Sequence, residues 1–425
     1  MKTNSEMVNS GVDWLGEIPS HWELRRARYM FRQSTSKGNN RLVLLSATQD
    51  RGVVDKSTLD SVVQVAADAD LSLFKTVHKN DFVISLRSFQ GGFEISHEEG
   101  VISPAYTVFR LTQQEYPHYY RYLFKSYGFI DKINSLTVGI REGKNIQYVD
   151  FSNMLLPYFA LEEQQKIASF LDKKCAEVDE MIALQEQIIE ELKAYKQSVI
   201  TEAVTKGLNP AVPMKDSGIE WIGQIPEHWE VCKIKNSLKI NPPQCHKLEE
   251  DTEVSYMPME CLRNGVIEKR VALYGSLPSL TEFSDGDIVM AKVTPCFENG
   301  NIAIASDLTN GVGFGSSEVF VFRCHDNTLS NYAFYYLQSP YVKARGVSSM
   351  TGTGGLKRVN PHYFCDSVML LPSYFEQQEI ADYLDTKCTE IDNLISIKLS
   401  KIDSLKEYKK SIIYEYVTGK KEVTE

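Results

Sequence analysis

The stretch EEQQKIASFLDKKCAEVD, from Glu162 to Asp179, occurs again as FEQQEIADYLDTKCTEID, from Phe375 to Asp392. A second stretch, SGVDWLGEIPSHWE from Ser10 to Glu23, returns as SGIEWIGQIPEHWE from Ser217 to Glu230. Chance does not produce two such repeats in the same order in a chain of ordinary composition. The sequence is therefore an internal duplication, in which each copy contains one globular segment followed by one helical segment.

The segment from Leu161 to about Lys206 has the pattern of one long helix. It contains no proline or glycine, its apolar residues recur at helical spacing, and Gly207 and Pro210 follow it as stop signals. The second copy opens with a plausible capping box, Ser373 and Glu376. Unbroken, each helix would be roughly 70 Å long, too long for burial inside a small domain, so we expect the two apolar stripes to bury each other as a coiled-coil-like pair. The residues predicted at this helix interface are Leu171, Val178, Ile182, Ile189, Leu192, Leu384, Ile391, Ile395, Ile402 and Leu405.

A duplication of this kind favours a pseudo-twofold arrangement, with antiparallel helices and one globular segment at each end of the pair. The stripe is polar at Gln185 and Lys398, near the middle of each predicted helix. These residues either form a polar layer that fixes the register of the pair or lie at a solvated position in an imperfect seam.

The globular segments contain short β-branched and aromatic runs, such as Ala105–Leu111 and Glu318–Arg323, separated by glycine-rich turns. A helical patch follows the strands in each segment. The predicted fold class is α+β, with two globular domains separated by two long antiparallel helices that form a coiled-coil-like spacer. The predicted domains are 1–157, the first spacer helix 158–210, 211–372, and the second spacer helix with a C-terminal tail, 373–425.

Composition places the chain among ordinary soluble globular proteins: 425 residues, 43% hydrophobic and 24% charged. The eight cysteines form no C-x-x-C pair, which favours free thiols in a reducing compartment over zinc ligands. Neither a signal peptide nor a membrane-spanning run is recognisable, so we expect a cytoplasmic protein without a membrane partner. The net charge of −10 argues against a polyanion partner unless basic residues gather locally, and basic clusters do occur in both globular segments.

A catalytic site is not recognisable in the sequence. Asn241-Pro242-Pro243-Gln244 is similar to the tetrapeptide of adenine-N6 methyltransferases, but glutamine replaces the aromatic residue that stacks on the flipped base. The glycine-rich stretch Thr351–Val359 lacks the G-K-[ST] of a P-loop. The repeated His21 and His228 are better explained as structural histidines than as catalytic bases. We therefore expect a chain without catalytic residues, bound metal or cofactor.

Two glycine-flanked loops have the composition of DNA-reading loops: LRSFQGGFE, Leu86 to Glu94, and AKVTPCFENGN, Ala291 to Asn301. Arg and Lys can donate to guanine, and Gln and Asn can pair with adenine, although many polar hairpins bind no ligand. The predicted DNA-contacting residues of the first globular segment are Arg87, Ser88, Gln90, Arg141 and Lys144. Those of the second are Lys292, Thr294, Glu298, Asn299, Lys357 and Arg358.

Taken together, these motifs resemble the specificity subunit of type I restriction-modification enzymes along nearly the whole chain. The marks are the repeated W-L/I-G-x-I-P-x-H-W-E, Arg87–Arg110, Gly286–Asn301, Asn310–Arg323, and the repeated E-Q-Q at the start of each helix. The resemblance implies two target-recognition domains that each bind one half of a bipartite, asymmetric double-stranded DNA sequence, and a helix pair that sets the gap between the halves. It also implies two modification subunits, which would carry S-adenosylmethionine and methylate adenine. Restriction subunits would add ATP- and Mg-dependent translocation and cleavage.

Two functions of other classes stay open. One is a methyltransferase or nuclease with a site of its own, and the other is a tandem protein-interaction scaffold that binds no DNA. The salt dependence of DNA affinity distinguishes the DNA reader from the scaffold, because phosphate contacts weaken linearly with the logarithm of the salt concentration.

Overall fold

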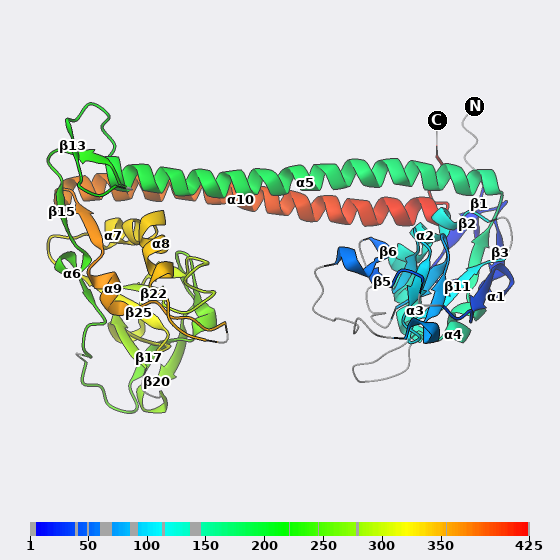
Figure 1. Ribbon diagram of the computed structural model, residues 1–425, viewed down its shortest axis with the longest axis horizontal. Helices are drawn as coiled ribbons and strands as arrows, with labels where there is room; N and C mark the ends of the chain where they lie inside the picture. The colour runs from blue at the N-terminus through cyan, green and yellow to red at the C-terminus, as the bar shows by residue number, and fades with distance from the viewer. Residues whose placement is uncertain are drawn as a thin grey trace. The chain divides into compact units, whose positions relative to one another are not determined.

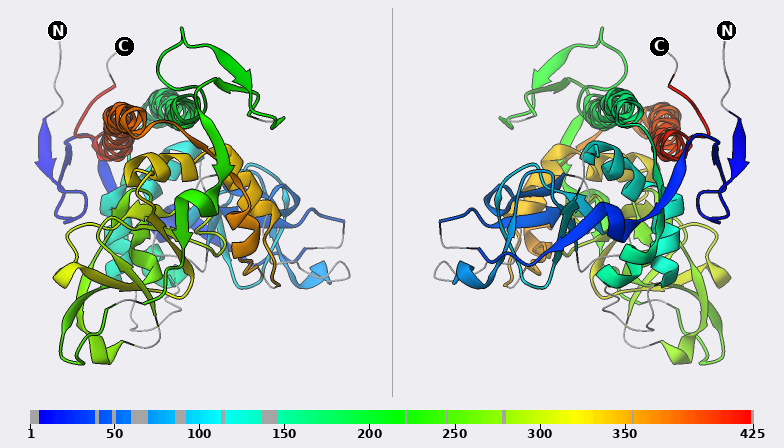
Figure 2. Two further views of the ribbon diagram at one scale, coloured as in Figure 1. Left: turned by 90° about the vertical axis from the view of Figure 1, so that its left-hand side faces the viewer. Right: turned by 90° about the vertical axis from the view of Figure 1, so that its right-hand side faces the viewer.

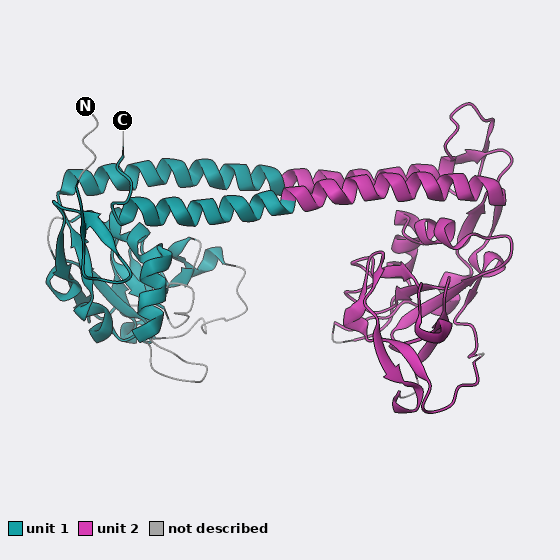
Figure 3. Ribbon diagram, turned by 180° about the vertical axis from the view of Figure 1, so that it is seen from behind, with its two compact units in different colours: residues 1–186, 399–425 teal, residues 187–398 magenta. Residues whose placement is uncertain are grey.

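The computed structural model describes residues 6–38, 41–48, 51–59, 70–85, 92–112, 115–136, 146–220, 222–244, 246–277, 280–353 and 355–423 (Figure 1). The chain divides into two compact units, the first made of residues 1–186 and 399–425 and the second of residues 187–398 (Figure 3). Each unit combines one globular part, here called the first head (before Leu161) or the second head (207–373), with parts of two long helices. The predicted α+β fold class is confirmed.

The long helices are α5 (Leu161–Lys206) and α10 (Tyr374–Val417). Helix α5 ends where Gly207 takes a φ of 74°, a left-handed conformation that glycine adopts at little cost. Only half of the predicted capping box forms at the start of α10. Ser373 Oγ accepts a hydrogen bond from the Glu376 backbone N at 3.3 Å, while the Glu376 carboxylate bonds elsewhere.

Within each unit the two helices run antiparallel (Figure 1), and the end-on views show them side by side (Figure 2). In the first unit Lys409 Nζ lies 2.6 Å from Asp179 Oδ1, and the rings of Phe170 and Tyr416 are 4.4 Å apart. In the second unit Lys196 Nζ lies 2.7 Å from Asp392 Oδ2. Each partner of one ion pair is 213 positions from its counterpart in the other (179 and 392, 196 and 409), so the repeat extends to the contacts between the helices.

The residues predicted at the helix interface are all removed from solvent to some degree. The buried ones are Leu171, Val178, Ile189, Leu384, Ile391 and Ile402, and the half-buried ones are Ile182, Leu192, Ile395 and Leu405. Gln185 is 6% exposed, so it is not a solvated position, and its Oε1 has no hydrogen-bond partner among the described residues. Lys398 is half-buried.

The first head contains a four-stranded antiparallel sheet in the order β4-β11-β8-β9, four two-stranded ladders and four short helices. Its strands are β1 (Met7–Asn9), β2 (Glu17–Pro19), β3 (Glu23–Arg26), β4 (Phe31–Ser34), β5 (Leu45–Thr48), β6 (Gly52–Asp55), β7 (Lys75–Val77), β8 (Phe82–Ile84), β9 (Phe93–Ile95), β10 (Gly100–Ile102), β11 (Thr107–Leu111) and β12 (Leu155–Tyr158). Its helices are α1 (Ala27–Met30), α2 (Pro117–Lys125), α3 (Tyr127–Leu136) and α4 (Tyr148–Asn153). The counts refer to the described residues.

The second head has the same kind of sheet in the order β16-β25-β22-β23, and beside it a further four-stranded sheet, β20-β17-β24-β21. Its strands are β13 (Met214–Asp216), β14 (Gln224–Pro226), β15 (Glu230–Lys233), β16 (Leu238–Ile240), β17 (Glu253–Met257), β18 (Leu262–Arg263), β19 (Val266–Ile267), β20 (Arg270–Leu273), β21 (Thr281–Ser284), β22 (Ile288–Ala291), β23 (Ile302–Ile304), β24 (Val312–Gly315), β25 (Val319–Cys324) and β26 (Val368–Leu371). Its helices are α6 (Ile234–Ser237), α7 (Ser330–Leu337), α8 (Pro340–Ser348) and α9 (Pro361–Cys365).

The core of each unit joins the head to the long helices. In the first unit a cluster of phenylalanines, including Phe82, Phe109 and Phe124, continues into residues of α5 and α10 such as Leu171 and Val417. The core of the second unit has the same plan. Because apolar burial is shared between head and helices, each head is stabilised by the helices that it contacts.

The described residues include no helix with the length and hydrophobicity that crossing a bilayer requires. Seven cysteines fall within these residues, and all seven are free thiols.

Candidate nucleic-acid interface

The two repeated motifs meet in the structure and form a joint between each head and the start of a long helix. In the first unit Glu163 accepts hydrogen bonds from Trp22 Nε1 at 3.1 Å and from His21 Nε2 at 3.0 Å. The second unit repeats this joint with Glu376 as the acceptor, from Trp229 Nε1 at 3.0 Å and His228 Nε2 at 2.9 Å. Both histidines therefore have structural partners, and the joint is the physical reason for the repeated His-Trp and Glu-Gln pairs.

A fully buried glutamine follows each of these glutamates. Gln164 Nε2 donates to the Phe159 carbonyl at 3.0 Å, and its Oε1 accepts from the Tyr116 N at 3.0 Å. Gln377 makes the equivalent bonds, to the Pro372 carbonyl at 3.0 Å and from the Leu329 N at 2.8 Å. Because buried backbone groups need partners, these side chains satisfy the loops that meet the helix starts.

In the second head the structure brings two loops with predicted DNA-contacting residues together. Val293 and Arg358 form a β-bridge. Thr294 Oγ1 donates to the Gly355 carbonyl at 2.8 Å and accepts from the Lys357 N at 2.9 Å. Lys292, Thr294, Lys357 and Arg358 therefore lie in one connected substructure at the end of β22. We call it the paired loops, residues 292–301, 351–353 and 355–359.

Charge on the paired loops is partly neutralised. The Arg358 guanidinium forms a two-armed ion pair with the Glu318 carboxylate, at 2.8 and 2.9 Å. These hydrogen bonds lower the pKa of Glu318 and raise that of Arg358. The Lys292 ammonium lies 6.0 Å from the centre of the Phe320 ring. Arg358 therefore reaches a phosphate or base only if Glu318 is displaced or the pair binds as a unit.

The exposed lysines and polar groups of this region have more freedom. Lys357 is exposed and no described residue pairs with its ammonium group, and the same holds for Lys343 on α8. Glu298 and Asn299 are exposed on the turn between β22 and β23. Helix α8 packs closely against that turn at Gly346, where an added Cβ would lie 2.2 Å from the Phe297 ring. Glycine at this position therefore lets α8 pack directly against the turn that contains Glu298 and Asn299.

The predicted contacts of the first head, Arg87, Ser88, Gln90, Arg141 and Lys144, lie outside the described residues. The strands beside the first loop are described, however. β8 pairs with β9 in the first head as β22 pairs with β23 in the second, so the loop that contains Arg87 is the counterpart of the loop that contains Lys292.

Sequence reasoning missed three structural roles. Glu318 is the partner of Arg358, and the two residues come together through the β-bridge at Val293. No pattern in the sequence indicates this pair. An ion pair with a buried carboxylate and a partly exposed arginine joins Arg110 to Asp81 at 2.7 Å, and Arg323 to Asp287 at 2.6 Å, in the two equivalent sheets. The position of both arginines at the end of a repeated V-F-R could have indicated this pair.

Asn241 also has a structural role. Its Oδ1 accepts a hydrogen bond from the Val321 N at 3.0 Å, and its backbone N donates to the Val321 carbonyl at 2.7 Å. These bonds hold a turn in which Asn241 has a φ of 49°. Within the described part of the chain, no group of three or more His, Cys, Asp or Glu residues is placed to hold a metal ion.

Comparison with known proteins finds relatives of one kind, although no protein-family model matches the chain. It is 29% identical over 223 residues to the type I restriction enzyme EcoEI specificity subunit of Escherichia coli, a match that covers 51% of this chain and 37% of the relative. It is 27% identical over 364 residues to the type I restriction enzyme MjaVIII specificity subunit of Methanocaldococcus jannaschii, with 81% and 80% covered. The chain thus matches little more than a third of the E. coli relative's length, and most of the M. jannaschii relative's.

Two solved structures have a similar fold. A chain from a structure concerning complex assembly and conformational transition of the type I R-M system has a TM-score of 0.69 at 13% identity, covering 94% of this chain and 98% of that one. The HsdS subunit from Thermoanaerobacter tengcongensis has a TM-score of 0.51 at 15% identity, covering 95% and 98%. The predicted resemblance is confirmed: the chain is similar in sequence to specificity subunits of type I restriction enzymes and similar in fold to an HsdS subunit.

Proposed function

We propose that this chain is a DNA-reading specificity subunit that recognises a bipartite, asymmetric target, with one half-site bound by each head. The helix pair of α5 and α10 sets the gap between the halves and docks two modification subunits. Those subunits supply S-adenosylmethionine and methylate adenine, and restriction subunits add ATP- and Mg-dependent cleavage. The complex works on double-stranded DNA in the cytoplasm.

The observation that carries this proposal is the combination of equal joints with unequal heads. The hydrogen bonds that attach each head to its helix are the same in type and nearly the same in length. The structures beside the common sheet differ, because the second head alone has, among the described residues, a second four-stranded sheet. A protein that reads two different half-sites requires this combination of one scaffold and two surfaces.

The charge of the second head is compatible with DNA despite the net charge of −10. Exposed Lys343 and Lys357 provide phosphate contacts near the paired loops, while Asn299 and Glu298 have side chains that can bond to base edges. Glu318 restrains Arg358, so a correct base that competes for the guanidinium would be favoured over a wrong one that does not.

The experiment is co-expression of the chain with its cognate modification subunit, followed by mapping of methyladenine on plasmid DNA. The expected result is methylation of adenines in two sequence blocks separated by a constant gap. The logarithm of the affinity of the purified complex for the mapped site should fall linearly with the logarithm of the salt concentration. Each lysine that contacts a phosphate should contribute about one to the magnitude of this slope. A flat response, with no methylation, would favour the protein-interaction scaffold.

A further inference from the structure

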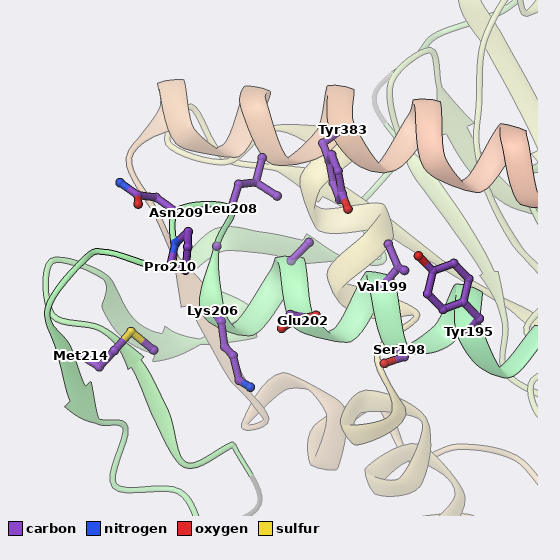
Figure 4. A pocket seen from close by; sticks show the side chains of 12 residues that line it. Tyr195, Ser198, Val199, Glu202, Lys206, Leu208, Asn209, Pro210, Met214 and Tyr383 are labelled. Carbon is purple, nitrogen blue, oxygen red and sulfur yellow. The ribbon is translucent and has the colours of Figure 1, made fainter.

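The second unit contains a cavity of about 720 Å³ at the end of α5, on the surface of the helix pair. Its wall includes Tyr195, Glu202 and Ala203 of α5, Tyr383 of α10, and Leu208 in the turn after α5 (Figure 4). Figure 4 shows Tyr383 extending from α10 toward α5. Tyr195, Tyr383 and Leu208 are exposed at 57%, 38% and 41%, so apolar surface faces solvent here.

In the first unit the chain itself fills the equivalent space. The counterpart of Tyr383 is Phe170, and the counterpart of Ala203 is Tyr416, each 213 positions away. The rings of Phe170 and Tyr416 are in contact, with centres 4.4 Å apart. The helix-pair ion pairs, Lys196 with Asp392 and Lys409 with Asp179, show that the two regions are equivalent. Alanine thus stands in the wall of the cavity at the position where the other copy has tyrosine.

The two regions also differ in how their equivalent glutamates are paired. In the first unit Glu415 forms an ion pair with Lys421 at 2.8 Å, in the turn that follows α10. Its counterpart Glu202 is exposed, and no residue of the described chain forms an ion pair with it. The turn after α5 has Leu208 in this region. The second unit thus lacks the aromatic ring that Tyr416 supplies in the first, and the basic side chain in its lining, Lys206, forms no ion pair with Glu202 among the described residues.

We infer that this cavity receives an aromatic side chain of a docking modification subunit, with a lysine or arginine beside it that pairs with Glu202. Tyr416 and Lys421 show the chemistry of the occupant, because they fill the equivalent space in the first unit. The inference rests on the proposed function for the identity of the partner. Its consequence is that the two docking positions of the duplicated helix pair are unequal, and the one on the second unit binds its subunit more tightly.

The test exchanges the two residues between the copies. Stepwise binding of the cognate modification subunit to the full chain is measured by mass photometry for the wild type, Ala203→Tyr and Tyr416→Ala. The wild type should bind one subunit at least tenfold more tightly than the other. Ala203→Tyr should weaken the tighter step by about tenfold, or about 1.4 kcal/mol, and leave the weaker step unchanged. Tyr416→Ala should strengthen the weaker step.

A partner-free measurement accompanies the exchange. 4-Methylphenol, the side-chain analogue of tyrosine, should raise the melting temperature of the wild type at millimolar concentration and have no such effect on Ala203→Tyr. Circular dichroism establishes that both variants fold. Two equal binding steps in the wild type, or an Ala203→Tyr chain that binds and responds to 4-methylphenol as the wild type does, would overturn the inference. Absence of any modification-subunit binding to the wild type would instead overturn the proposed function.

Discussion

The two units repeat one sheet and one joint, and then diverge around them. Sheet β4-β11-β8-β9 of the first head and sheet β16-β25-β22-β23 of the second have equivalent strand orders and the same partly buried Arg–Asp pair. Beside them lie two-stranded ladders in one described head and a complete second sheet in the other. The duplication thus preserved the contacts that attach and position a head, and changed the surfaces available to a ligand.

Substitutions at the joint should have the largest effect, and each should affect only its own unit. Trp22→Ala and Trp229→Ala each remove a buried indole and its hydrogen bond to a glutamate, so each should destabilise its own unit by about 3–5 kcal/mol. Hydrogen exchange measured by mass spectrometry should show increased opening in the unit that contains the change. The exposed Tyr29→Ala serves as a control with little effect. Equal opening of both units by either variant would show that the joints are not local.

The helix interface allows a second matched pair. Ile189 and Ile402 are equivalent, 5% and 4% exposed respectively, and replacement of either by alanine should cost about 2–4 kcal/mol. Urea denaturation followed by circular dichroism measures this loss. Ile397→Ala, at a position 62% exposed on α10, should change the free energy of unfolding by less than about 0.5 kcal/mol. If all three variants had equal stability, the apolar stripe would not be the interface.

A substitution in the paired loops tests whether the two heads act independently. Asn299→Ala removes an exposed amide whose side chain forms no hydrogen bond with the described residues, so the fold should be unaffected. Discrimination at one position of one half-site should fall by about 1–3 kcal/mol, while the other half-site is read as before. Competition binding with single-base variants of the target measures both. Lys193→Ala, on the exposed surface of α5, is the control. Relaxation of both half-sites would contradict independent heads.

The smallest expected effect concerns pH. Burial, followed by repulsion from Arg121, lowers the pKa of His97 and His118, whose rings lie 6.5 Å apart in the first unit. The unfolded chain therefore takes up protons first as the pH falls below about 6.5, and the first unit loses stability between that pH and the lower folded-state pKa values. The other groups that act on the pair are Lys79, Glu98 and Asp172.

A variant separates this effect from general acid sensitivity. The second unit has Asn331 at the position equivalent to His118, so His118→Asn should reduce the loss of stability in the first unit between pH 7 and 5. Hydrogen exchange at the two pH values, corrected for the intrinsic rate, measures this change in each unit. An unchanged loss in the variant would mean that His118 does not contribute.

Local patterns allowed the helices and many strands to be predicted. The absence of glycine and proline between Leu161 and Lys206 indicated α5 with its observed bounds, and apolar runs indicated β11 and β25. The joints could not be predicted, because His21 and Glu163 are distant in sequence and either could have had a solvent partner. The repeat showed that these residues matter, but only the three-dimensional contacts showed what they do.

The candidate site was predictable in composition and less so in detail. Lys292, Thr294 and Lys357 were chosen for residue type, and the β-bridge that joins their loops depends on tertiary packing. The pairing of Arg358 with Glu318 was not visible for the same reason. The contrast between Ala203 and Tyr416, however, is present in the sequence once the copies are aligned. The structural effect of this contrast follows from the contact between the rings of Phe170 and Tyr416.

The position of the joint in the sequence bears on how one head can be exchanged for another. Its hydrogen-bonding residues flank the four-stranded sheet of each head in the sequence, with His21 and Trp22 before the first head's sheet and Glu163 after it. A genetic crossover at these positions would exchange the segment between them as a unit and leave the hydrogen bonds of His21 and Trp22 to Glu163 in place. Under the proposed function, such an exchange would change the half-site that is read without breaking the joint.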